Sequence, residues 1–156
     1  MQLSSCAFDE GGWIPKKYSA RGEDLSPALH IEDLPKGTKS LMITMDDSSH
    51  PLFPNYNHWI IWNIPVIHDI PEALPKGERI GLLSDAMQGI AYGKHCYKGP
   101  KPPFKTIHYY VFTVYALSDV VNMPTTSKKG DLLKQVEGMI LGKATLTGKF
   151  QSRRQE

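Results

Sequence analysis

The sequence is poor in cysteine, in long apolar runs and in net charge, and each shortage excludes a class of protein. Its 156 residues contain two cysteines, Cys6 and Cys96, which lie far apart and outside any Cys-x-x-Cys pair, so neither a thiolate zinc site nor a thioredoxin-like motif is indicated. No stretch approaches the roughly 18 consecutive apolar residues of a membrane-spanning helix. The net charge of +2, with both signs scattered, lacks the basic stripe that is typical of nucleic-acid-binding proteins. We therefore expect neither a nucleic-acid partner nor an integral membrane protein.

The N-terminus also lacks the basic segment, followed by an apolar segment, that marks a secretory signal peptide. We therefore expect a cytoplasmic protein with free thiols, although the residues leave a disulfide between the two cysteines open. Apolar residues make up 40% of the chain and charged residues 22%, which is typical of one folded globular domain. We interpret the basic cluster of Lys149, Arg153 and Arg154 as belonging to a solvated C-terminal tail.

Windows long enough for a helix are few, because 12 prolines and 13 glycines are spread along the chain. The frequent prolines and glycines favour short strands with many turns. The strand 108–117 is apolar on both faces, which predicts a central position in a packed sheet. One helix is predicted over 131–141, where apolar residues recur at three- and four-residue steps, although Gly138 interrupts it. The other predicted strands are 40–45 and 58–64, with weaker candidates at 28–31 and 144–150.

Polar residues gather in three clusters near the ends of these predicted strands. Asp46-Asp47-Ser48-Ser49-His50-Pro51 follows the first, His58-Trp59 opens the next, and Tyr97-Lys-Gly-Pro-Lys-Pro-Pro103 precedes His108. Each also fits a plain structural role: a turn, a core histidine bonded to the backbone, or a rigid surface connection. Together they predict one site in which imidazoles donate to a phosphate or carboxylate oxygen and Asp47 holds one imidazole in the donor tautomer. The prolines would form a stiff wall, and Gly99 would allow the backbone to approach a ligand.

These clusters resemble the two signatures of the phosphatidylethanolamine-binding protein family, also called the Raf kinase inhibitor-like family, and look most like its short bacterial and archaeal branch. The first signature, Asp-Pro-Asp-x-Pro, then His-Trp, then Asn-Ile-Pro, is matched at 47–51, 58–59 and 63–65. The second, Tyr-x-Gly-x-x-Pro-Pro and then His-Arg-Tyr, is matched at 97–103 and 108–110. Further elements match in the right order at 14–15, 26–29, 34–40 and 115–117.

The resemblance implies an all-β fold, a Greek-key β-sandwich of two antiparallel sheets with one or two short peripheral helices. It would form a single domain over residues 3–150 and leave 151–156 as a basic tail. The resemblance also implies a pocket for phosphate, a phosphorylated headgroup or a carboxylate, and it implies no cofactor, metal ligand or catalytic residue. The positions that match the pocket of the family are Asp47, His58, Gly99, Pro102, Pro103, His108 and Tyr110.

The sequence departs from the family pattern at the rim of this expected pocket. Ser48 and Ser49 replace the signature proline and second aspartate, and Tyr109 replaces the arginine of His-Arg-Tyr. The loss of one acidic and one basic residue is expected to alter the rim and to leave the net charge there nearly unchanged. The three inner groups, Asp47, His58 and His108, remain.

The function that this resemblance implies is a binding module that captures a small anionic ligand and modulates a protein partner, such as a kinase pathway or a protease. Bacterial relatives tend to form dimers, so a homodimer is the expected assembly. Two alternatives remain. One is a serine-protease inhibitor that acts through an exposed loop. The other is a hydrolase in which Asp47, His58 and His108 serve as general acid–base groups or metal ligands.

Overall fold

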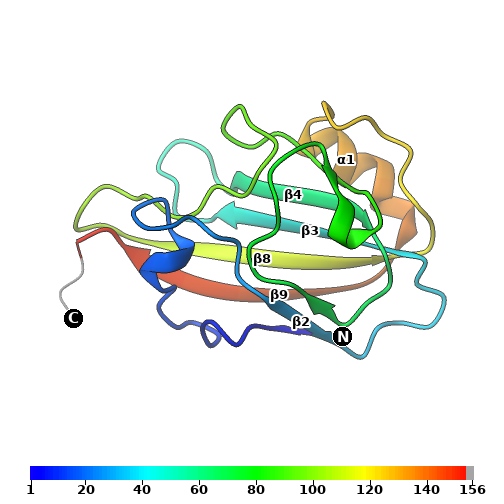
Figure 1. The fold of residues 1–156 in the computed structure, drawn as a ribbon, viewed down its shortest axis with the longest axis horizontal. Helices are drawn as coiled ribbons and strands as arrows, with labels where there is room; N and C mark the ends of the chain where they lie inside the picture. Colours follow the sequence, from blue (N-terminus) through cyan, green and yellow to red (C-terminus); the bar gives the residue numbers. More distant parts are fainter. Residues whose placement is uncertain (154–156) are drawn as a thin grey trace.

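Two antiparallel β-sheets share one hydrophobic core, which confirms the predicted all-β fold (Figure 1). The computed structural model describes residues 1–153. A six-stranded sheet has the order β6-β7-β4-β3-β8-β9, and a three-stranded sheet has the order β1-β2-β5. The strands are β1 (Gln2–Ser4), β2 (Leu29–Glu32), β3 (Ser40–Asp47), β4 (Tyr56–Ile64), β5 (Asp69–Ile70), β6 (Arg79–Ile80), β7 (Ala86–Gln88), β8 (Ile107–Leu117) and β9 (Ile140–Gln151).

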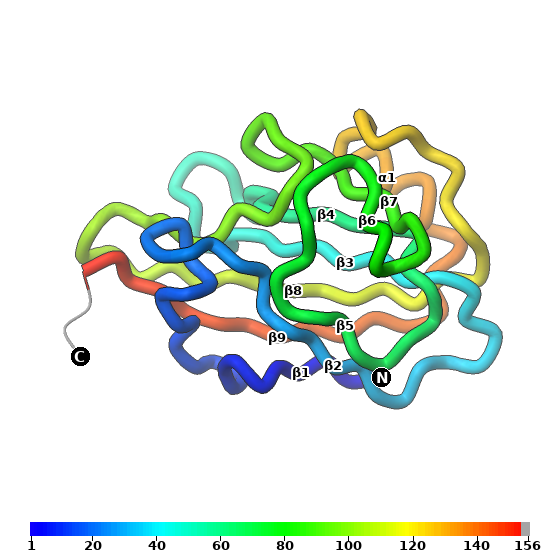
Figure 2. Tube along the Cα trace, viewed as in Figure 1, coloured from blue at the N-terminus to red at the C-terminus, as the bar shows by residue number. Residues whose placement is uncertain are grey.

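The centre of the larger sheet is β3, which is buried along its whole length between β4 and β8. It pairs with β8 from Ser40↔Leu117 to Asp47↔Tyr110. The chain reaches β8 only after three short strands, and this return of a later strand to the side of β3 is the crossover of a Greek key. Figure 2 shows the chain between β5 and β7 crossing in front of the larger sheet on this path.

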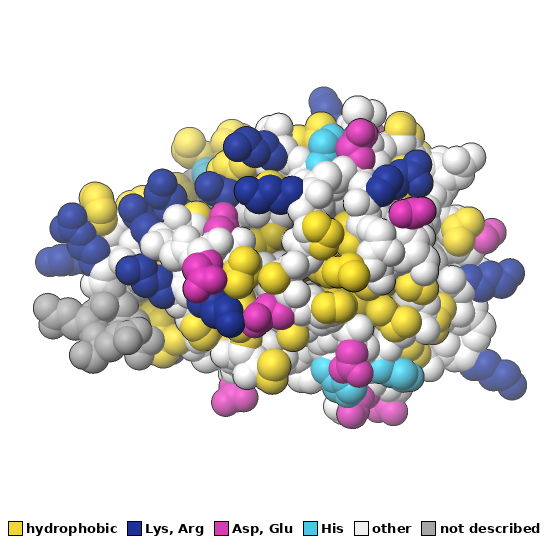
Figure 3. Space-filling view, viewed as in Figure 1, with side chains coloured by type: hydrophobic (Ala, Val, Ile, Leu, Met, Phe, Trp, Pro, Cys, Tyr) yellow, Lys and Arg dark blue, Asp and Glu magenta, His cyan; other side chains and the backbone are white. Residues whose placement is uncertain are grey.

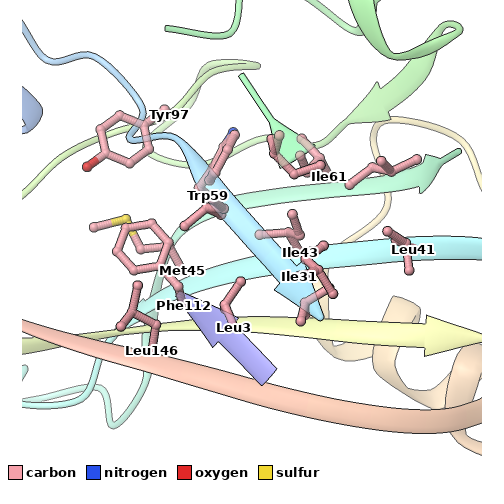
Figure 4. Close-up of a cluster of buried hydrophobic side chains, with 14 of the residues drawn as sticks. Leu3, Ile31, Leu41, Ile43, Met45, Trp59, Ile61, Tyr97, Phe112 and Leu146 are labelled. Carbon is pink, nitrogen blue, oxygen red and sulfur yellow. The ribbon is translucent and has the colours of Figure 1, made fainter. Parts of the chain in front are cut away.

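Strand β8 lies between β3 and β9, as its apolar pattern predicted, and both of its faces are covered over residues 112–117. Tyr110, Phe112 and Val114 point into the core between the sheets and are at most 1% exposed. Figure 4 shows Phe112 in that core beside Met45 of β3. Tyr115 lies on the opposite face, in a second apolar cluster that includes side chains of the helix α1 (Lys129–Val136). The helix therefore covers the outer face of the larger sheet, and alternating side chains of one strand contribute to two cores.

The helix predicted over 131–141 is shorter at its C-terminal end than expected. It ends at Val136, and a single 3-10 turn (Glu137–Met139) leads directly into β9. Ile140 pairs with Leu117 of β8, so Ile140 and Leu141 belong to the strand. The periodicity of the apolar residues did not separate these two states, because pairing with β8 overrides the local helical pattern. Two further 3-10 turns span Lys16–Tyr18 and Gly81–Leu83.

Strand β3 is also two residues longer than predicted, with a consequence for the candidate site. Asp46 and Asp47 were placed in a loop after the strand, but both pair with β4 and β8. The ladders on either side hold the backbone extended despite the low strand propensity of aspartate. Asp47 therefore lies on a strand that is paired along both of its edges.

The C-terminal cations of the described chain lie against aromatic rings. The Lys149 Nζ atom is 4.7 Å from the centroid of Trp13, and the guanidinium of Arg153 is 3.9 Å from that of Phe104. Lys149 and Gln151 belong to β9, Ser152 and Arg153 follow it, and residues 154–156 of the predicted basic tail lie outside the described residues. Figure 3 shows charged side chains of both signs over the face in view.

The two cysteines are both free: Cys6 is exposed and Cys96 is buried. Over residues 1–153, no helix has the length and apolar character that crossing a membrane requires.

Candidate functional site

A cavity of about 260 Å³ opens where one end of β3, β4 and β8 meets two loops. All seven residues that the sequence assigned to the pocket line it, so the structure brings the three clusters together. A cavity of this size accommodates a small anion or headgroup rather than a large cofactor. Its lining consists of Asp47, His50, Pro51, His58, Tyr92, Lys98, Gly99, Lys101, Pro102, Pro103, His108 and Tyr110.

Asp47 and His108 form a buried pair on the β3–β8 side of the cavity. The Nδ1 atom of His108 donates to the Oδ2 atom of Asp47 over 2.7 Å. His108 is 9% exposed and Asp47 is 3% exposed. The backbone N–H of Ser49 donates to Oδ1 of the same carboxylate over 2.8 Å. The pairing of Asp47 with Tyr110 sets this contact, because His108 lies two residues before Tyr110 on the same face of β8.

His58 lies on the opposite side of the cavity and is held by main-chain atoms. Its Nδ1 atom donates to the Lys98 carbonyl over 2.6 Å, and the Lys98 N–H donates back to the His58 carbonyl over 3.1 Å. Burial lowers the pKa of His58 below its usual value, although the Lys98 carbonyl and the charge of Asp47 oppose that shift. The ring is therefore neutral near pH 7.

Two tyrosine rings enclose His58. The centroid of Tyr110 lies 5.3 Å from that of His58 with the planes at 82°, and the centroid of Tyr92 lies 5.0 Å away at 64°. The Tyr92 hydroxyl is 3.3 Å from Nε2 of His58. Burial raises the pKa of both phenols, so they stay protonated and can donate hydrogen bonds.

The segment 98–103 forms one wall of the cavity, and Gly99 is part of its lining. A Cβ atom on Gly99 would lie 2.3 Å from the Tyr18 carbonyl oxygen and 2.5 Å from Oδ1 of Asp24. The Gly99 N–H donates to that same Asp24 oxygen over 2.7 Å. The absent side chain thus lets the wall pack closely against the segment behind it, whereas the approach of a ligand to Gly99 stays a prediction.

The residues that depart from the family pattern join the rim strands to each other. The N–H and the hydroxyl of Ser48 both donate to the Tyr109 carbonyl, over 2.9 and 3.0 Å. The Tyr109 N–H donates to the Ser49 hydroxyl over 3.0 Å. Tyr109 alternates with the pocket residues of β8, and its side chain is 44% exposed. Neutral hydrogen bonds between β3 and β8 therefore hold this rim.

Five lining residues were not assigned to the pocket from the sequence: His50, Pro51, Tyr92, Lys98 and Lys101. Four of them lie inside the two quoted signatures, so their position was a usable signal. Tyr92 lies outside both signatures, on a loop where it adopts a left-handed backbone conformation with φ of 52°. No pattern in the sequence identified Tyr92.

A metal centre finds no support among the described side chains. Over residues 1–153, no group of three or more His, Cys, Asp or Glu side chains could hold a metal ion. In the pocket, the Nδ1 atoms of both histidines are already bonded to protein oxygens, which leaves only Nε2 for any other contact.

Fold and pocket together define a class: an antiparallel β-sandwich that presents an Asp–His pair and a second histidine at the ends of its central strands. A family model described as phosphatidylethanolamine-binding protein matches residues 4–151, and the chain belongs to this family. A UPF0098 protein of Pyrococcus horikoshii is 36% identical over 94% of this chain and 75% of its own length. One from Methanothermobacter thermautotrophicus is 35% identical over 96% of this chain and 98% of its own length.

Solved structures of two bacterial proteins share the fold. One is a phosphatidylethanolamine-binding protein homologue from Chlamydia trachomatis, with a TM-score of 0.83 and 34% identity over 96% of each chain. The other is YbcL of E. coli, described as a member of the mammalian family, with a TM-score of 0.86 and 25% identity. That alignment covers 96% of this chain and 97% of YbcL.

Proposed function

We propose that this protein is a binding module that captures a small anion, a phosphate, phosphorylated headgroup or carboxylate, in the pocket of Asp47, His58 and His108. One observation carries the proposal: residues from three distant segments of the chain line a single cavity in which buried imidazoles face a compact space. A buried polar site of this kind is costly unless it serves structure or ligand binding. Lys98 and Lys101 add positive charge to the lining.

The surroundings of the cavity supply a contact area for a protein partner. Phe53, Tyr92 and Phe104 are 56%, 48% and 49% exposed, and each lies in or beside a lining segment. Exposed aromatic side chains are enriched where proteins meet. A partner that contacts these residues would sense an occupied pocket, which is how the module would modulate it.

The test is thermal unfolding in increasing inorganic phosphate, with sodium chloride used to hold the ionic strength constant. A ligand that binds only the folded protein stabilises it by about 2.7 kcal/mol at 100 times Kd. For a domain of this size we expect a rise in Tm of several degrees. An unchanged Tm over the whole phosphate range would overturn the proposal.

A matched pair of variants assigns the effect to the pocket. In His58→Gln the pocket loses an imidazole, and we expect the phosphate-dependent rise in Tm to shrink. His68→Gln is the control, because the Nδ1 atom of His68 also bonds a backbone carbonyl, that of Ile31 over 2.8 Å, but outside the pocket. Equal loss of phosphate protection in both variants would contradict binding at this site.

A further inference from the structure

The hydrogen bonds of His58 and His108 fix which ring nitrogens carry protons. A carbonyl oxygen and a carboxylate oxygen can only accept, so Nδ1 of each ring is protonated against Lys98 and Asp47. Because burial lowers the pKa of His58, that ring is neutral near pH 8 and its Nε2 atom carries a lone pair and no proton. The proton that Asp47 fixes on Nδ1 of His108 points at Asp47 and not into the cavity.

The contacts around His58 agree with that assignment. Among residues 1–153, the group that bonds to Nε2 of His58 is the Tyr92 hydroxyl at 3.3 Å, which then acts as the donor. His50 has the opposite polarity, because its Nδ1 accepts from the N–H groups of Leu52 and Phe53 over 3.2 and 3.1 Å. The neutral His50 ring therefore carries its proton on Nε2. The pocket presents both acceptors and donors.

The charged groups near His58 do not change this picture. The carboxylates of Asp46 and Asp47 act on it from β3 and that of Asp24 from the segment before β2, and all three favour protonation. Burial outweighs them in the opposite direction. The rings of Tyr56, Tyr92 and Tyr110 also lie against His58, and Lys98 and Lys101 line the same cavity.

A fully deprotonated anion would therefore place an oxygen lone pair against the lone pair of Nε2 of His58. We propose that the pocket binds the proton-carrying form of its anion, a hydrogen phosphate monoester or a carboxylic acid, with that proton between Nε2 of His58 and a ligand oxygen. This inference rests on the proposed anion-binding function. It adds that an anion without a proton takes one from solution when it binds.

The proton balance distinguishes two anions of similar shape. Near pH 8, inorganic phosphate is HPO₄²⁻ and brings the one proton that the contact with His58 needs. Sulfate brings none and must take one from the buffer. That transfer only moves a proton from a buffer acid to the Nε2···O contact, and no other bond changes. Sulfate binding should thus take up one more proton than phosphate binding, and its Kd should rise about tenfold more per pH unit.

The test is isothermal titration calorimetry of the full chain with each anion at pH 8. Repeating each titration in buffers of different ionisation enthalpy gives the number of protons taken up. We expect uptake of about one proton with sulfate and none with phosphate. Equal uptake for the two anions, or none with either, would overturn the inference while binding itself stands. Absence of binding to phosphate at every pH from 6 to 8 would instead overturn the proposed function.

Two variants locate the proton. His58→Gln lacks this acceptor and should bind sulfate without proton uptake, whereas His68→Gln should match the wild type. Tyr92→Phe removes the hydroxyl that competes for Nε2 of His58 and keeps the ring, so it tests the pocket without altering either histidine. We expect it to bind sulfate a few-fold more tightly with wild-type proton uptake. Loss of that uptake in Tyr92→Phe would contradict the assignment to the His58 nitrogen.

Discussion

The two sides of the pocket hold their histidines by different means. On the β3–β8 side, His108 bonds a buried carboxylate that belongs to a strand paired on both edges. On the β4 side, His58 bonds the Lys98 carbonyl, which belongs to a loop without regular secondary structure. The first contact is charge-assisted and depends on one side chain. The second depends on where a backbone lies, and therefore on everything that packs behind it.

The largest loss of stability is expected from a substitution on the β3–β8 side, where the contact with His108 depends on one side chain. In Asp47→Asn, the charge-assisted bond to His108 becomes a neutral one, and the amide group can no longer accept from both His108 and the Ser49 N–H. We expect unfolding free energy to fall by about 1.5–3 kcal/mol, as for hydrogen bonds to charged groups. Urea denaturation measures this loss.

The control for that variant is Asp69→Asn. Asp69 also accepts from a histidine, His30, over 2.7 Å, but on the exposed face of the smaller sheet. Exposed ion pairs contribute little because water screens them. Equal destabilisation in the two variants would show that burial of Asp47 has no energetic consequence.

A smaller effect is expected from moving the backbone on the other side. In Gly99→Ala, the added Cβ meets the Tyr18 carbonyl and Asp24, and the wall must shift. Overpacking of this kind costs about 1–3 kcal/mol, and the Lys98 carbonyl would move away from His58. The imidazole NMR signals of His58 should change while those of His108 keep their positions.

Gly130→Ala is the matched control, because a Cβ there meets no atom within 4 Å and the position is helical. This substitution should stabilise the protein by about 0.5–1 kcal/mol. If Gly99→Ala left both the stability and the His58 signals unchanged, the dependence of this side on backbone position would be wrong.

The smallest effect is expected from pH, and it should come from the His58 side. Burial holds the pKa of folded His58 below the value of about 6.5 in the unfolded chain, so the unfolded chain takes up its proton first as the pH falls. The contribution of neutral His58 is therefore present above pH 6.5 and is lost as the pH falls toward the folded pKa. In buffer without phosphate, Tm should decline from pH 7 to 5.5 less steeply for His58→Gln than for the wild type. Identical slopes would contradict the lowered pKa.

The sequence allowed the fold and the inner pocket to be predicted for one reason: the matched signatures are short, ordered and tied to particular strands. Asp47, His58 and His108 needed only their positions in those signatures. The directions of their hydrogen bonds did not follow, because the partner of His58 is a main-chain carbonyl that any residue at position 98 would supply. Tyr92 was missed for a related reason, since only the path of its loop brings it to the cavity.

Two other predictions were wrong, and both have the same physical cause. The predicted helix reaches Leu141 and the predicted strand stops before Asp46 and Asp47, because local patterns cannot account for pairing between distant strands. The close packing behind Gly99 could not be predicted for a similar reason. Its neighbours Tyr18 and Asp24 are about 80 residues away along the chain, and no local pattern links them to it.

The long sequence separation of the pocket contacts has a consequence for folding kinetics. The bond between Asp47 and His108 closes a loop of 61 residues, and that between His58 and Lys98 a loop of 40. Contacts of such high order form late, after the entropy of closing those loops has been lost. An anion that needs both histidines then meets its site only once the native topology is complete. The bound anion would slow unfolding of the native protein and leave the folding rate unchanged, so it would increase the kinetic stability of the native state.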